Sequence, residues 1–122
     1  MEADKTANIL FHAAMAVGSG RCSSVIPAIF DACRYLQCEN AWTDRGVVIK
    51  LYGTLYGHVG DAWPVMRNPR GGRWLLPKHK LELLTTLLFA YEYVVQEMGG
   101  ARSPADPSAL QVKDVVLNLD YS

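Results

Sequence analysis

Apolar residues recur at three- and four-residue steps along the first third of the chain, a spacing that predicts amphipathic helices. The first predicted helix runs from Asp4, a residue type that often caps helices, to Val17, and a glycine-rich turn then ends it. The second begins at Ser23 or Ser24 and tolerates a proline in its first turn. Its predicted apolar face consists of Ile26, Ile29, Phe30, Cys33 and Leu36.

A third helix is predicted to begin at Thr43, which can cap it, and to continue to Tyr56. Its apolar face contains Val47, Val48, Leu51, Tyr52, Leu55 and Tyr56. Gly46 and Gly53 lie inside this helix, and each should destabilise it by roughly 0.5–1 kcal/mol relative to alanine.

The strongest helical pattern begins at Pro77, a residue type favoured at the first helical position, and ends before Gly99 and Gly100. Its apolar stripe consists of Leu81, Leu84, Leu87, Leu88, Tyr91, Val94, Val95 and Met98. Leu83 and Phe89 widen the apolar arc, so we expect other helices to contact this one on two sides. The pattern therefore predicts that this helix is the hub of the core.

Two segments lack a clear period. The stretch from Gly57 to Leu76 is rich in glycine and proline, which predicts a long loop, and long loops in small domains are often functional. In the tail, Asp106 and Pro107 are typical of a helix start, whereas Leu117, Leu119 and Tyr121 alternate as in a strand. A short helix is the preferred interpretation of the tail.

The patterns together predict a mainly α fold. Residues 1–122 are expected to form a single compact helical domain, a bundle of four to five helices with a long Gly/Pro/Trp loop before the longest helix. Half of the residues are hydrophobic and 20% are charged, which is typical of a globular protein and not of a disordered one.

The overall charge, the lengths of the apolar stretches and the N-terminal residues indicate where in the cell the protein is expected. The twelve acidic residues balance the twelve basic ones, so no overall charge directs the chain to nucleic acid or to a membrane surface. No apolar stretch approaches the roughly eighteen residues of a transmembrane helix. The N-terminal residues Met1 to Lys5 are acidic where a signal peptide is basic, which favours a cytoplasmic protein.

Cysteine and histidine, which often act in catalysis or bind metals, are scattered along the sequence. Cys22, Cys33 and Cys38 lack the spacing of a zinc site, and free structural thiols are the preferred interpretation. His12 is expected at the boundary of the core, and His58 and His79 at the surface. No cofactor, metal site or catalytic residue is predicted, although a small enzyme that uses a cysteine or histidine is a third functional hypothesis.

One segment stands out by its charge. No acidic residue occurs between Asp61 and Glu82, and this window contains five basic residues, with Trp63 and Trp74 beside them. Indole rings next to guanidinium groups are common where proteins bind acidic surfaces or nucleotides. The candidate binding residues are therefore Trp63, Arg67, Arg70, Arg73, Trp74, Lys78 and Lys80.

The same segment has a purely structural interpretation. The two tryptophans can anchor the loop to the core, since tryptophan side chains are usually largely buried. Asp106, Asp114 and Asp120 in the tail can neutralise the bases from within the molecule. Lys78 and Lys80, by contrast, oppose the dipole of the helix that they begin, and tolerance of this cost favours the functional interpretation.

The order of the parts resembles small uncharacterised proteins encoded by bacteriophages and mobile elements. The resemblance rests on a cysteine-bearing helix (Ser24–Leu36), a glycine- and tryptophan-rich loop (Gly57–Trp74) and a final helix (Leu81–Val95). It covers about two thirds of the chain. It implies a host-directed accessory role, such as an inhibitor of a bacterial defence or regulatory protein, and identifies no functional residue.

The leading hypothesis is a non-enzymatic protein whose segment Trp63–Lys80 binds an acidic protein surface and occludes it. The alternative is a small anion-binding protein that sequesters a nucleotide or contacts nucleic acid through the same residues. A homodimer is a further option, because so apolar a small chain can present a hydrophobic face to a second copy.

Overall fold

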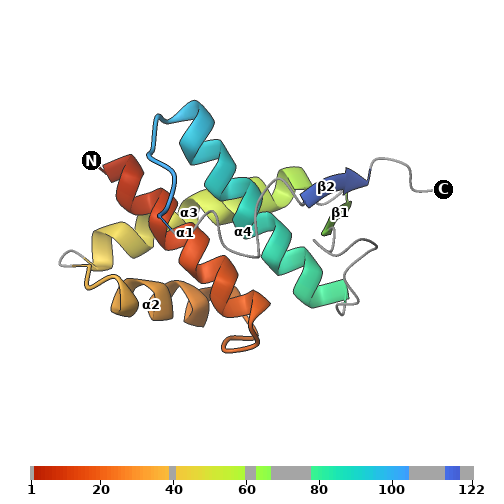
Figure 1. Cartoon of the computed structure of the whole chain (residues 1–122), viewed down its shortest axis with the longest axis horizontal. Helices are drawn as coiled ribbons and strands as arrows, with labels where there is room; N and C mark the ends of the chain where they lie inside the picture. Colours follow the sequence, from red (N-terminus) through yellow and green to blue (C-terminus); the bar gives the residue numbers. More distant parts are fainter. Residues whose placement is uncertain (1, 39–40, 60–62, 67–77, 105–114, 119–122) are drawn as a thin grey trace.

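The computed structural model describes residues 2–38, 41–59, 63–66, 78–104 and 115–118. Within these ranges the chain is mainly helical, as the sequence predicts. The helices are α1 (Glu2–Gly18), α2 (Val25–Tyr35), α3 (Ala41–Val59) and α4 (Lys78–Glu97), and the strands are β1 (Trp63–Met66) and β2 (Val115–Asn118). Figure 1 shows α1 and α4 crossing the middle of the molecule, with α2 along one side and the strand pair near one end.

Helices α1 and α4 pack against each other in antiparallel orientation. Lys80, in the first turn of α4, lies beside Gly20 just after α1, and Gly100, beyond the end of α4, lies against Ala3 at the start of α1. All five alanines of α1 are buried, namely Ala3, Ala7, Ala13, Ala14 and Ala16. Because alanine side chains are short, neighbouring helices can approach the backbone of α1 closely.

The central element is α1, which packs against all three of the other helices. The wide apolar arc of α4 predicts α4 as the hub, and this prediction is only partly correct. Helix α4 contributes a large buried face, Leu83, Leu84, Leu87, Leu88, Ala90, Tyr91 and Val94, directed mainly at α1 and α3. The prediction favours α4 because large apolar residues dominate a hydrophobic pattern. The alanines of α1 contribute little to that pattern, although they allow other helices to pack against α1 on several sides.

Helix α2 begins after Ser24, as predicted, but its buried face differs from the predicted one. The side chains of Ile26 and Phe30 are 52% and 38% exposed. The buried residues of α2 are Val25, Ala28, Ile29, Ala32 and Cys33. Ile29 and Cys33 are thus buried as predicted, whereas Ile26 and Phe30 face outward and the packing uses Val25, Ala28 and Ala32 instead.

Two predicted caps are wrong. Asp4 lies inside α1, where its Oδ1 accepts a hydrogen bond from the Ala101 N–H at 2.7 Å. Thr43 lies inside α3, which begins at Ala41. In both cases the helix extends further toward its N-terminus than the capping residue suggests, because a favourable residue type alone does not determine where a helix begins.

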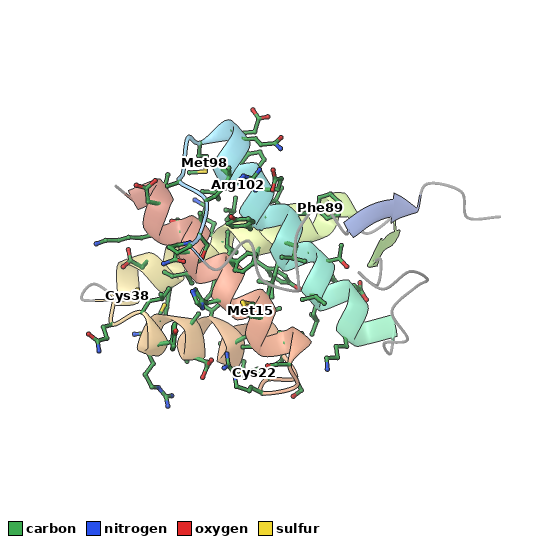
Figure 2. All side chains as sticks on the ribbon, in the orientation of Figure 1. Met15, Cys22, Cys38, Phe89, Met98 and Arg102 are labelled. Atoms are coloured by element: carbon green, nitrogen blue, oxygen red, sulfur yellow. The ribbon has the colours of Figure 1, made fainter. Side chains whose placement is uncertain are left out.

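Residues 99–104 form a strap that runs from α4 back across α1 (Figure 1). The Ser103 N–H donates to the Tyr91 hydroxyl at 3.0 Å, and the Ser103 hydroxyl donates to Asn8 Oδ1 at 2.7 Å. Arg102, labelled in Figure 2, forms two hydrogen bonds with the Glu92 carboxylate at 2.6 and 3.1 Å. The strap therefore joins α4 to α1 by polar contacts.

The loop and tail predictions require correction. Helix α3 continues to Val59, past the predicted loop start at Gly57, and β1 occupies part of the predicted loop. Strand β2 pairs with β1 in antiparallel register, with Trp63 opposite Asn118, so residues 115–118 are not helical. The backbone groups of residues 115–118 form their hydrogen bonds with β1. The local preference of a segment for helix or strand does not reveal that such a partner strand is present. The predicted helix start at Asp106 lies outside the described residues.

Gly46 and Gly53 lie inside α3, and no heavy atom lies within 4 Å of the position that a Cβ would take at either residue. We expect Gly46→Ala and Gly53→Ala each to raise the free energy of unfolding by roughly 0.5–1 kcal/mol, because alanine loses less conformational entropy on folding. Urea denaturation of each variant measures the change. A decrease in stability would contradict the helical, open environment of these positions.

Gly100 provides the opposite case. A Cβ at this position would lie 2.8 Å from the Ala3 carbonyl oxygen and 3.0 Å from Val94 Cγ1. We expect Gly100→Ala to lower the free energy of unfolding by about 1–3 kcal/mol, because the strap must move away from α1. The same denaturation series measures this effect, and a neutral result would show that the strap is not closely packed.

Candidate functional site

The structure describes only part of the predicted basic site. The backbone of Trp63 begins β1, and Lys78 begins α4, but their side chains are not described. Lys80 is the one predicted site residue with a described side chain, which is half-buried. Arg67, Arg70, Arg73 and Trp74 lie outside the described residues.

Lys80 has a structural role that the sequence does not suggest. Its Nζ lies 3.8 Å from the position that a Cβ would take at Gly20, directly after the C-terminus of α1. Helix α1 has no basic residue in its last turn, and the exposed carbonyl groups at a helix C-terminus favour a nearby cation. The packing of α1 against α4 therefore places the Lys80 ammonium group near the negative end of the α1 dipole.

A different group of residues comes together where α2 ends and α3 begins. The Cys38 N–H donates to the Cys33 carbonyl at 3.1 Å, and the Gln37 N–H donates to the Arg34 carbonyl at 3.2 Å. These two bonds, with Gln37 in the left-handed region at φ 53°, define a Schellman motif. Glycine usually occupies that left-handed position, so the presence of glutamine is unusual.

The Schellman motif brings two cysteine side chains together. Cys33 and Cys38 occupy the two positions whose side chains commonly touch in this motif, and both residues line the same surface pocket. Burial is the main cause that raises the pKa of the Cys33 thiol to about 11, and the neighbouring Cys38 and Asp44 act in the same direction. The guanidinium group of Arg45 acts in the opposite direction. Cys33 is therefore a protonated thiol at neutral pH.

A surface pocket of about 280 Å³ opens beside this pair. We call it the α2–α3 pocket, and its lining residues are Phe30, Cys33, Arg34, Gln37, Cys38 and Arg45. The Arg45 guanidinium lies over the Phe30 ring, 4.6 Å from its centroid, in a cation–π arrangement. The pocket thus combines an aromatic ring, two cations and two thiols.

A second pocket of similar volume lies on the other side of the same turn. It is lined by Lys5, Asn8, Leu36, Gln37 and Cys38. Gln37 and Cys38 therefore border both pockets. Figure 2 labels Cys38 just beyond the end of α2, at the opposite end of that helix from Cys22.

Asp44 lies in the first turn of α3 and is only 6% exposed. Among the described residues, no hydrogen-bond donor contacts its Oδ2 atom. A carboxylate in the first turn of a helix is stabilised by the positive end of the helix dipole, which accounts for its position there. Its negative charge also disfavours a thiolate at Cys33.

Sequence reasoning did not identify this site. Cys22, Cys33 and Cys38 are free thiols in the structure, as predicted, but the contact between the last two was not anticipated. Their five-residue separation across a predicted helix end was the available signal, because a Schellman motif joins such positions. Arg34, Gln37 and Arg45 were not predicted site residues.

His12 lies at the boundary of the core, as predicted. Its ring stacks against Tyr35, with 4.9 Å between ring centroids, and burial followed by the charge of Arg21 lowers its pKa. The imidazole is therefore neutral at pH 7. In the part of the chain that the structure describes, no three His, Cys, Asp or Glu residues cluster as metal ligands would.

No family model, curated protein or solved structure matches this chain. Within the described helices, none is both long enough and apolar enough to cross a membrane. A function must therefore be inferred from the chemistry of the described surface.

The raised pKa of Cys33 makes stability depend on pH. Its ordinary value is 9.0 and its value in the folded protein is about 11, so the folded state holds this proton more tightly than the unfolded state. The stabilisation is fully present below pH 9 and is lost as the pH rises toward 11. We expect the free energy of unfolding to fall across this window, measured by urea denaturation with a reductant present.

Cys33→Ala is the matched variant for this measurement, because it removes the titrating thiol. It should show a shallower fall over the same window, although the raised pKa values of Tyr52 and Tyr56 leave a remaining slope. Equal slopes in the two proteins would show that the Cys33 thiol does not contribute.

Proposed function

We propose that this chain is a non-enzymatic binding protein that recognises an acidic protein surface through the α2–α3 pocket. The observation that supports this proposal is the Arg45 guanidinium stacked on the exposed ring of Phe30, with Arg34 lining the same pocket. Arginine and aromatic residues dominate the energetics of many protein interfaces. Arg34, which is exposed, can bind a carboxylate through two parallel hydrogen bonds.

The surroundings of the pocket favour a protein partner. Ile26 lies one turn before Phe30 on the outer face of α2, and both side chains are exposed. An apolar strip beside arginines is typical of the central part of a protein interface. Ile26 offers neither a charge to a phosphate group nor a ring on which a base could stack, so it adds nothing to a nucleotide site.

The basic segment Trp63–Lys80 is a separate proposed contact for an acidic partner. Its charge supports this proposal, and its side chains other than Lys80 lie largely outside the described residues. The resemblance to proteins encoded by bacteriophages makes a bacterial host protein the first partner to test. Binding would then inhibit that protein by covering its surface.

The first test is affinity purification from a bacterial lysate with the wild-type chain and with the variant Arg34→Glu/Arg45→Glu. The partner that the wild type retains is then purified, and its Kd for each chain is measured by calorimetry. We expect the charge reversal to weaken binding about tenfold or more, because removal of interface arginines commonly costs over about 1.4 kcal/mol. An unchanged Kd would exclude the α2–α3 pocket as the contact.

Lys50→Glu is a matched control, since Lys50 is an exposed base on α3 that does not line the pocket. It should leave the Kd nearly unchanged, and thermal melts should show that all variants are folded. Arg67→Glu/Arg70→Glu/Arg73→Glu tests the basic segment independently. Tight binding of a short oligonucleotide that weakens steeply with salt would instead support the nucleic-acid alternative.

A further inference from the structure

We propose that Cys33 and Cys38 are an oxidisable pair that forms a reversible intramolecular disulfide when the protein meets hydrogen peroxide. The proposal concerns the thiols of the α2–α3 pocket and does not depend on the binding function. It rests on the contact between the two side chains, on the geometry of the turn that joins them and on the access that the pockets give to Cys38.

The backbone holds the two thiols together in the reduced protein. The Cys38 N–H to Cys33 carbonyl bond fixes the ends of the turn, and the left-handed conformation of Gln37 reverses the chain between them. Both cysteines also line the same pocket, and Cys38 contributes to the raised pKa of the Cys33 thiol, so the two sulfur atoms begin as neighbours. Cys22, before α2, has no such thiol neighbour among the described residues.

The two cysteines differ in exposure, which assigns them different roles. Cys38 is half-buried and borders both pockets, so a molecule as small as hydrogen peroxide can reach its sulfur. Cys33 is only 4% exposed and is part of the hydrophobic core. Cys38 is therefore the thiol that reacts with the oxidant, and Cys33 is the thiol that resolves the product.

The chemistry balances with peroxide as the only oxidant. The Cys38 thiolate attacks one peroxide oxygen, the O–O bond breaks, and the departing hydroxide takes up a proton to give water. Cys38 becomes a sulfenic acid, oxidised by two electrons. The Cys33 sulfur then attacks the Cys38 sulfur, the S–O bond breaks, and the hydroxide leaves with the Cys33 proton as a second water.

The disulfide would convert the Schellman motif into a covalent cap of α2. The turn at Gln37, whose side chain borders both pockets, would then be fixed by a bond in addition to its two hydrogen bonds. The cross-link also restricts the unfolded chain, so the oxidised protein should melt at a higher temperature than the reduced one. Thiol reductants would reverse the change.

The test treats the full chain with hydrogen peroxide, removes the peroxide with catalase, and alkylates the remaining thiols with N-ethylmaleimide in denaturant. We expect one alkylated cysteine in place of three, a mass lower by two hydrogen atoms before alkylation, and a peptide that links Cys33 to Cys38. Dithiothreitol should restore all three thiols. Three alkylated cysteines, or a disulfide that includes Cys22, would overturn the proposal.

Three variants test the roles. Cys22→Ser should form the disulfide at the wild-type rate. Cys33→Ser should accumulate a sulfenic acid at Cys38, which dimedone traps, whereas Cys38→Ser should leave Cys33 reduced while the protein is folded. Oxidation of Cys33 in Cys38→Ser as fast as in the wild type would contradict the assigned order. The same treatment in urea should lose the preference for this pair, because the turn is absent there.

Discussion

The close antiparallel packing of α1 against α4 determines the positions of most other elements. This packing is possible because the short side chains of the α1 alanines let α4 approach the α1 backbone closely. The packing also places the start of α4 beside the end of α1. Lys80 thereby reaches the C-terminus of α1, and the strap of residues 99–104 reaches Asp4 and Asn8 at the other end. Hydrogen bonds of the strap therefore join one end of the pair, a cation lies beside the other, and apolar packing joins the middle.

The position of α2 follows from the same constraint. The buried face of α2 contains Ala28, Ile29 and Ala32, so Ile26 and Phe30 remain on the outer face. Arg45 from α3 then covers part of the Phe30 ring. The aromatic and cationic character of the α2–α3 pocket is thus a consequence of which face of α2 is buried, and not of a separate binding loop.

The helices could be predicted from the sequence because each has apolar residues at three- and four-residue steps, and Gly99 at φ 72° marks the end of α4 where glycine is expected to stop it. The buried face of α2 was predicted only in part: Ile29 and Cys33 are buried as expected, but Ala28 and Ala32 were missed because alanine carries a weak hydrophobic signal. The pairing of β1 with β2 was also missed, because strands far apart in sequence stabilise each other only in the folded chain. The α2–α3 pocket was missed for a related reason, since it forms only once α2 and α3 have packed together.

Gln37 connects the local backbone with the candidate site. A left-handed residue at a helix end is normally glycine, because other residues are less stable in that conformation by roughly 1–2 kcal/mol. Such departures from local preference tend to occur at functional sites, where the surrounding structure holds them in place. Here the departure lies in the turn between the two cysteines, and Gln37 is a lining residue of both pockets. The one non-glycine residue with positive φ among the described residues therefore coincides with the place where thiols, arginines and an exposed ring meet.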